Sequence, residues 1–111
     1  MPNIVRAERL RAPQSQTLRF EGRDHGAAVS FFMVNAAPGG GPGTHRHPYA
    51  ETWHVLEGEA TFVVSGQSTL TTAGDTLTVP PHAWHSFHNS GTRGLRVMCI
   101  HPSDEIVQEF L

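Results

Sequence analysis

Three histidines and one glutamate are spaced so that they could hold a single metal ion. His45 and His47 are two residues apart, and in an extended segment residues i and i+2 point to the same side. Glu51 has the same parity, and Pro48 favours a bend before it. His85 opens a later segment with a strand-like pattern. Imidazoles with one carboxylate suit Fe, Mn, Ni, Co or Zn, whereas Ca and Mg prefer oxygen ligands. The sequence therefore predicts a site for one divalent transition metal.

The segments around these residues are short and strand-like, which predicts an all-β domain. Glycine (11 residues) and proline (8 residues) interrupt the chain, and the segments between them are rich in Val, Phe, Thr and Leu. Many short strands at regular spacing indicate a barrel or a sandwich. The predicted strands are 17–20, 27–36, 52–57, 60–65, 68–71, 75–79, 84–89 and 94–101.

Only the C-terminal segment has a helical pattern. Ser103 could cap a helix, acidic residues follow it, and Ile106, Val107 and Phe110 would form its apolar face. At 111 residues the chain has the size of one domain. The expected organisation is an N-terminal arm over 1–14, a barrel over 15–102 and a short C-terminal helix over 103–111.

Composition excludes several function classes. The chain has no lysine, which excludes Schiff-base chemistry and a P-loop. The net charge of −2 is spread over mixed acids and bases, so we expect no nucleic-acid partner. No apolar run is long enough for a membrane span or resembles a signal peptide. Cys99 is the only cysteine, and we expect it to be a buried small apolar residue. Together these features predict a cytoplasmic protein without a membrane partner.

The metal residues lie in a frame that resembles the two motifs of the cupin family. The first run is Gly39-x5-His45-x-His47-x3-Glu51-x6-Gly58, with every specified position present. The second is Gly74-x5-Pro80-x-His82-x2-His85-x3-Asn89, which matches four of five specified positions. The resemblance implies a single cupin domain with a double-stranded β-helix (jelly-roll) barrel. It also implies His45, His47, Glu51 and His85 as the metal ligands, turn glycines at 58 and 74, and a structural role for Asn89.

His82 departs from the family pattern, which has glycine at that position. A histidine can adopt a left-handed turn conformation at modest cost, so we expect the fold to tolerate it. His82 would lie near the barrel mouth, as a base, a substrate contact or a solvated turn residue. Tyr49, in the loop between ligands, is the other candidate for proton transfer. These two are the predicted catalytic residues beside the metal.

Strand alternation predicts a pocket beside the metal. Trp53 has the parity of Glu51, Phe87 has that of His85, and Phe62 could continue the lining. Such side chains would make an apolar cavity for a small organic molecule. The alternative is that Trp53 and Phe62 only fill the core. His54 and His88 have the opposite parity, which predicts that they point outward.

Four protein ligands leave two open positions on a six-coordinate metal, which favours catalysis over a closed structural site. His45-Arg46-His47 and Pro80-x3-Trp84-His85-x3-Asn89 are similar to segments of gentisate-type ring-cleaving dioxygenases, although those enzymes are larger and lack the glutamate. We therefore expect a dioxygenase-type oxidoreductase. The alternatives are a metal-dependent isomerase or lyase and a non-catalytic, metal-supported ligand-binding module. The outward apolar residues Leu56 and Trp84 predict a homodimer.

Overall fold

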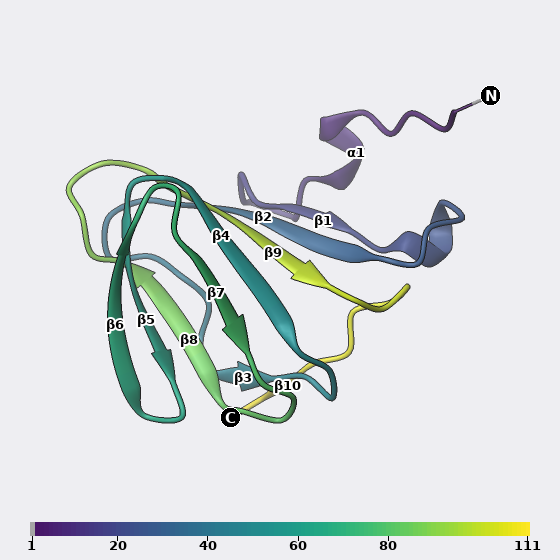
Figure 1. The fold of residues 1–111 in the computed structure, drawn as a ribbon. Coiled ribbons are helices and arrows are strands. Elements are labelled where there is room, and N and C mark those ends of the chain that lie inside the picture. The colour runs from purple at the N-terminus through teal and green to yellow at the C-terminus, as the bar shows by residue number, and fades with distance from the viewer. Residues whose placement is uncertain (1) are drawn as a thin grey trace.

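Residues 2–111 are described by a computed structural model and form two five-stranded antiparallel sheets that face each other (Figure 1). The first sheet has the order β1-β2-β9-β4-β7, and the second has the order β10-β3-β8-β5-β6. The strands are β1 (Leu18–Phe20), β2 (Ser30–Ala36), β3 (His45–Arg46), β4 (Glu51–Glu57), β5 (Glu59–Val64), β6 (Gln67–Thr72), β7 (Thr76–Val79), β8 (His85–Asn89), β9 (Leu95–His101) and β10 (Glu109–Phe110).

All eight predicted strands are present with ends within about three residues of the prediction, and the short strands β3 and β10 are additional. The chain passes repeatedly between the sheets, for example from β4 to β5 and from β8 to β9, in the manner of a jelly roll. Within residues 2–111, however, no strand ladder joins the edges of the two sheets. The expected barrel is therefore an open two-sheet sandwich.

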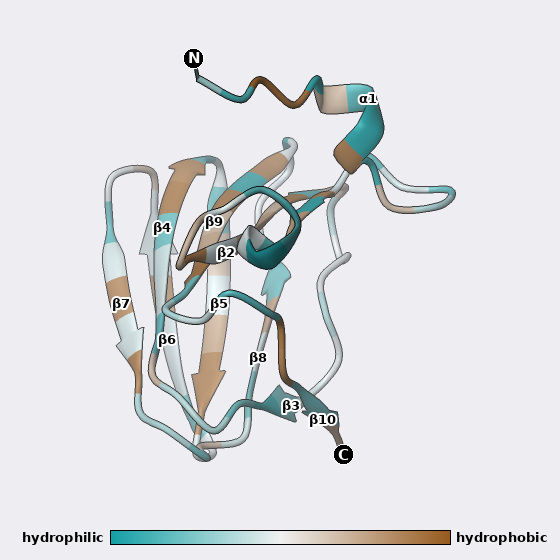
Figure 2. Ribbon diagram, turned by 90° about the vertical axis from the view of Figure 1, so that its right-hand side faces the viewer, coloured by the Kyte–Doolittle hydropathy of each residue, from teal (hydrophilic) through white to brown (hydrophobic). Residues whose placement is uncertain are grey.

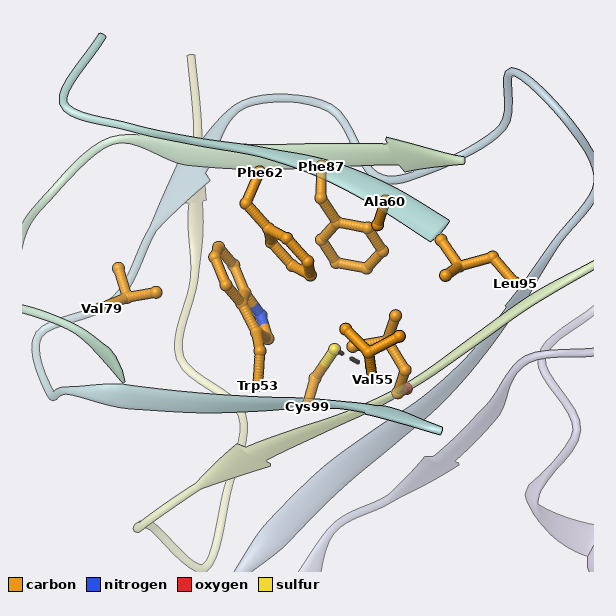
Figure 3. Close-up of a cluster of buried hydrophobic side chains, with 9 residues drawn as sticks. Trp53, Val55, Ala60, Phe62, Val79, Phe87, Leu95 and Cys99 are labelled. Carbon is orange, nitrogen blue, oxygen red and sulfur yellow. Dashed lines mark hydrogen bonds between the residues drawn. The ribbon is translucent and has the colours of Figure 1, made fainter. Parts of the chain in front are cut away.

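Apolar side chains from both sheets fill the space between them (Figure 3). Trp53 and Val55 alternate inward along β4, and Phe62 and Phe87 face them from β5 and β8. The ring centroids of Trp53 and Phe62 are 4.5 Å apart, and those of Phe62 and Phe87 are 4.8 Å apart. Period-2 alternation of apolar residues thus produces one layered core.

The predicted C-terminal helix is wrong. Residues 103–111 run from the end of β9 across to the other sheet, where β10 pairs with β3 (Figure 1). Glu109 is opposite Arg46, and their side chains form an ion pair at 3.1 Å. The edge of β3 supplies backbone hydrogen-bond partners for this segment, whereas an isolated helical turn would have to form its hydrogen bonds internally at a high entropic cost. The β-branched residues of the segment also favour an extended conformation.

The N-terminal arm carries the only α-helix of residues 2–111, α1 (Ala7–Leu10), and it projects from the sheets (Figure 2). A bridge between Arg11 and Leu18 returns the chain to β1, and a 3-10 turn, η1 (Gly22–Asp24), precedes β2. No helix in the described residues has the length and apolarity to cross a membrane.

Candidate metal centre

The four predicted ligands meet between the sheets at one end of the sandwich. His45 in β3 is directly opposite His85 in β8, so the two side chains project from the same face of the second sheet. Glu51 reaches them from β4 in the first sheet, and His47 follows β3. All four residues are buried. The structure thus brings the four predicted ligands together.

The spacing of the ligand atoms fits one transition-metal ion. The Oε1 atom of Glu51 lies 3.1 Å from Nε2 of His47 and 3.1 Å from Nε2 of His85. Two ligand atoms at right angles, each about 2.1 Å from one ion, are about 3.0 Å apart. Ligand atoms of all four residues lie within 4.8 Å of one another. In the described chain, the buried Nε2 atoms of His47 and His85 and Oε1 of Glu51 make no hydrogen bond, which a bound ion would explain.

Backbone carbonyl groups set the tautomers of the three ligand imidazoles. The Nδ1 atoms lie 2.6 to 2.8 Å from carbonyl oxygens, those of Gly43 for His45, Val107 for His47 and Ala83 for His85. A carbonyl oxygen only accepts, so each Nδ1 carries the hydrogen and each Nε2 keeps its lone pair. This arrangement orients the three rings toward a metal before it binds.

The electrostatics of the site favour the protonation states that a metal requires. Burial lowers the pKa of His45, which keeps that imidazole neutral. Burial alone would raise the pKa of Glu51, but the imidazoles of His101, His47 and His85 beside it hold that pKa well below its usual range. The pKa shifts of these two groups therefore favour a neutral His45 and an ionised Glu51 near neutral pH.

A fifth buried polar residue, His101, was not predicted from the sequence. It ends β9 with only 1% of its surface exposed, and its Nε2 lies 3.2 Å from Oε2 of Glu51. The two atoms are not aligned as a hydrogen bond. His101 belongs to neither motif, and the available signal was its inward parity with Val97 and Cys99 along a predicted strand.

A cavity of about 500 Å³ opens onto the metal centre. His45 and Glu51 lie in its wall, together with Trp53 and Phe87, as predicted for the pocket. Further apolar lining comes from β2, from the arm before β1 and from the C-terminal segment, namely Ala12, Phe32, Val34, Ala36 and Phe110. The volume suits a small organic molecule.

Phe62, in contrast, does not line this cavity. It is fully buried behind the rings of Trp53 and Phe87, so its role is that of a core residue. The two predicted catalytic residues also lie outside the cavity wall. His82 is exposed, has the expected positive φ of 65°, and donates its backbone N–H to the carbonyl of His47. The Tyr49 ring stacks on that of the ligand His47, with centroids 5.2 Å apart, and its hydroxyl lies 2.5 Å from Nδ1 of His101.

Residues with predicted structural roles are placed as expected. The Asn89 side chain ties together the loop that follows β8, donating to the carbonyls of Ala36 and Arg93. Cys99 is buried, and burial raises the pKa of its thiol well above the usual value. His88 is exposed and His54 lies at the surface, where its ring contacts the hydroxyl of Thr76.

The fold is similar to solved structures of larger enzymes. An oxalate oxidase matches with a TM-score of 0.76 and 23% identity over 86% of this chain and 54% of that chain. A variant of the oxalate decarboxylase of Bacillus subtilis matches with a TM-score of 0.79 and 21% identity, over 86% and 27% of the two chains. The Lactobacillus farciminis oxalate decarboxylase, as a formate complex, matches with a TM-score of 0.78 and 22% identity, over 86% and 30%.

At these identities the likeness shows the fold alone, and the chain spans about half or less of the length of these proteins. No curated protein sequence matches the chain. A family model described as "Cupin domain" matches residues 32–101, well over half of the chain and all four ligand positions. With that match, with two facing antiparallel sheets and with three imidazoles and one carboxylate converging between them, the chain belongs to the cupin family.

Proposed function

We propose that this cupin is a metal-dependent oxidoreductase of dioxygenase type. Its substrate would be a small metal-chelating molecule with an apolar carbon skeleton. The observation that carries the proposal is the position of His45 and Glu51, two of the four ligands, in the wall of a mainly apolar cavity. Four ligands leave positions for two further donors on a six-coordinate ion. A substrate with two adjacent oxygen donors could bind there and bury its carbon skeleton against Trp53, Phe87 and Phe32.

The cavity wall favours a substrate unlike oxalate. Among the described residues that line it, none is arginine, and the chain has no lysine. A small dianion would find the Glu51 carboxylate and apolar side chains there, without a cation other than the metal. A catechol, a diketone or an enol carries less charge and has apolar carbon atoms that gain free energy from burial.

In a ring-cleaving dioxygenation both atoms of O₂ enter the substrate, and the C–C bond between an oxygen-bearing carbon and its neighbour breaks. Those carbons supply the four electrons that reduce O₂. A redox-active metal, when bound, supplies the path for these electrons. His45, His47, Glu51 and His85 would hold it, their Nδ1–carbonyl contacts would fix the ring orientations, and the aromatic wall would exclude water.

The oxalate decarboxylase of Bacillus subtilis, one of the similar solved structures, has Mn(II) centres, which supports Mn(II) as one metal to load. The test is oxygen uptake by protein loaded with Fe(II) or with Mn(II), against catechols, diketones, enols and oxalate. We expect uptake with an apolar chelator and a cleaved product carrying both atoms of labelled O₂. Absence of uptake with every metal and substrate class would exclude the proposal.

A second candidate is a lyase that uses the metal as a Lewis acid, and the similarity to oxalate decarboxylases favours it. Release of CO₂ without net consumption of O₂ in the same assays would identify it. A non-catalytic ligand-binding module would bind the chelator to the metal without turning it over.

We also propose a homodimer, because Leu56 and Ile100 leave apolar side chains partly exposed on the outer face of the first sheet. Trp84 supports it less than expected, since the guanidinium of Arg46 covers its ring at 4.3 Å. Light scattering after size-exclusion chromatography should give twice the mass of 12.1 kDa, and a monomer would refute the dimer. The cytoplasmic location stays a prediction, testable by cell fractionation.

A further inference from the structure

The two oxygens of Glu51 have different neighbours. Oε1 lies 3.1 Å from the Nε2 atoms of His47 and His85, whereas Oε2 lies 3.2 Å from Nε2 of His101. His101 is not part of the set whose ligand atoms lie within 4.8 Å of one another. The carboxylate thus has one oxygen toward the metal ligands and the other toward a histidine outside that set.

The other ring nitrogen of His101 contacts Tyr49. The Tyr49 oxygen accepts the backbone N–H of Val107 at 3.2 Å and lies 2.5 Å from Nδ1 of His101. If Nδ1 donated to this oxygen, the single hydroxyl hydrogen of Tyr49 would have no other acceptor among the hydrogen bonds of the described residues. A hydroxyl that donates to Nδ1 would satisfy both groups and leave the imidazole hydrogen on Nε2.

With the hydroxyl as donor, His101 has the opposite tautomer to the three ligand histidines. His45, His47 and His85 donate from Nδ1 and present an Nε2 lone pair. With Nδ1 as acceptor, His101 has its hydrogen on Nε2, which lies 3.2 Å from Oε2 of Glu51 without being aligned on it as a hydrogen bond. This tautomer suits the electrostatics, because an ionised carboxylate oxygen 3.2 Å away attracts the positive end of an N–H bond.

We propose that His101, held by Tyr49, is a positioning residue that engages Oε2 of Glu51 and leaves Oε1 as the one carboxylate ligand of the metal. The N–H group of His101 favours monodentate binding and keeps a coordination position free for substrate. The inference rests on the metal site and does not depend on which reaction the site catalyses.

The C-terminal segment contacts both the ligand His47 and Tyr49, the neighbour of His101. The carbonyl of Val107 accepts from Nδ1 of His47, and its N–H donates to Tyr49. The segment is itself tied to the first sheet, since Glu21 accepts the N–H of Ile106 and Ser30 donates to the carbonyl of Ser103. One peptide segment therefore orients both a metal ligand and the residue that contacts Nδ1 of His101.

A matched pair of variants tests the proposal. In His101→Gln, the side-chain amide can donate to Oε2 and accept from Tyr49, whereas His101→Leu has similar size and no polar group. With Mn(II) as the probe, we expect His101→Leu to bind about 10 to 100-fold more weakly and His101→Gln to stay within about threefold of the parent protein, as is typical for residues that orient metal ligands. Tyr49→Phe should fall between them.

Pulsed EPR supplies the readout that a purely structural role would not change. We expect three coordinated imidazole nitrogens in the parent protein and in every variant, with a changed zero-field splitting only in His101→Leu and Tyr49→Phe. Four coordinated imidazoles in the parent would make His101 a ligand and overturn the proposal. So would parental Mn(II) affinity and an unchanged EPR spectrum in His101→Leu. Should His101→Leu fail to fold, the nitrogen count in the parent and the Tyr49→Phe spectrum still decide.

Discussion

The space between the two sheets divides into two halves that are built from the same strands. β4 carries Glu51 at one end and Val55 toward the other, and β9 carries His101 at one end and Leu95 at the other. All of these side chains point inward and are buried. One half holds imidazoles, a carboxylate and a cavity, while the other is a close-packed apolar core. Alternation determines which residues face inward, and position along the strand determines whether they serve chemistry or stability.

This contrast has an energetic basis. Burying an ionised carboxylate costs free energy unless its partners compensate, so the metal half does not by itself stabilise the fold when the ion is absent. The apolar half gains free energy from the area that it removes from water. We expect variants in the two halves to separate stability from metal binding.

The largest expected effect is on the apolar half. Phe62→Ala removes a fully buried ring that contacts Trp53 and Phe87, and it should lower the free energy of unfolding by about 3–5 kcal/mol. Urea denaturation of the metal-free protein measures this loss. Mn(II) affinity of the folded variant should stay close to that of the parent, and a joint loss of affinity would show that the two halves are coupled.

A change in the metal half should give the reverse pattern. His47→Ala removes one ligand and should lower Mn(II) affinity by more than about 100-fold, beyond what loss of a residue that only orients ligands costs. Equilibrium dialysis with elemental analysis measures it. His54→Ala is the matched control, because His54 faces outward from β4 and its ring contacts the hydroxyl of Thr76 rather than the ligands. Equal affinities in the two variants would argue against the site.

Alanine substitutions at two glycines in the apolar half test the contrast between the halves by a steric change alone. Gly58 and Gly74 both have positive φ, at 88° and 97°. An added Cβ at Gly58 would lie 2.6 Å from the carbonyl oxygen of Gly94, whereas at Gly74 it would meet no atom within 4 Å. Gly74→Ala should therefore cost about 1 kcal/mol for the backbone alone. Gly58→Ala should cost about 1–3 kcal/mol more.

Thermal or urea unfolding of both variants measures that difference. Metal affinity should remain at the parental value in each folded variant. If the two substitutions cost the same, the close approach between Gly58 and Gly94 does not constrain the loop between β4 and β5.

The smallest expected effect is the pH dependence of the metal-free protein. The pKa of His45 and the pKa of Glu51 are both lower in the folded state than their ordinary values of 6.5 and 4.5. The folded state therefore binds fewer protons than the unfolded chain as the pH falls. Stability should be greatest above about pH 6.5, decline below it through His45, and decline further below about pH 4.5 through Glu51.

Urea midpoints measured between about pH 8 and pH 4 in the presence of a chelator test this order. His45→Gln should flatten the part of the decline that begins near pH 6.5. A midpoint that rises on acidification would contradict both shifts.

Much of the fold and the ligand set could be predicted from the sequence because the signals are local. Alternation within each strand and turn residues between strands give the eight main strands. The tail was misread for the same reason, since Ile106, Val107 and Phe110 repeat at helical spacing. Its structure depends instead on the backbone edge of β3, which is some sixty residues away in the sequence.

Prediction of the pocket from the sequence is limited in the same way, because its lining depends on long-range packing. Parity correctly placed Trp53, Phe62 and Phe87 in the interior, yet only the packing of the three rings decides that Phe62 lies behind the other two. Likewise, the positive φ of His82 was expected from its motif position, whereas its distance from the cavity was not.

The sequence by itself determined the candidate metal centre: the spacing of His45, His47 and Glu51, and the second motif around His85, identify the four residues that the structure brings together. Only the tertiary structure revealed that His101 lies against Glu51 and that the Tyr49 hydroxyl contacts its other ring nitrogen. The physical reason is the distance along the sequence between the residues that form each feature. Ligand spacing and parity are properties of a few consecutive residues, whereas Tyr49, His101 and Val107 meet across more than fifty residues of chain, through the register of two sheets and a tail that crosses between them.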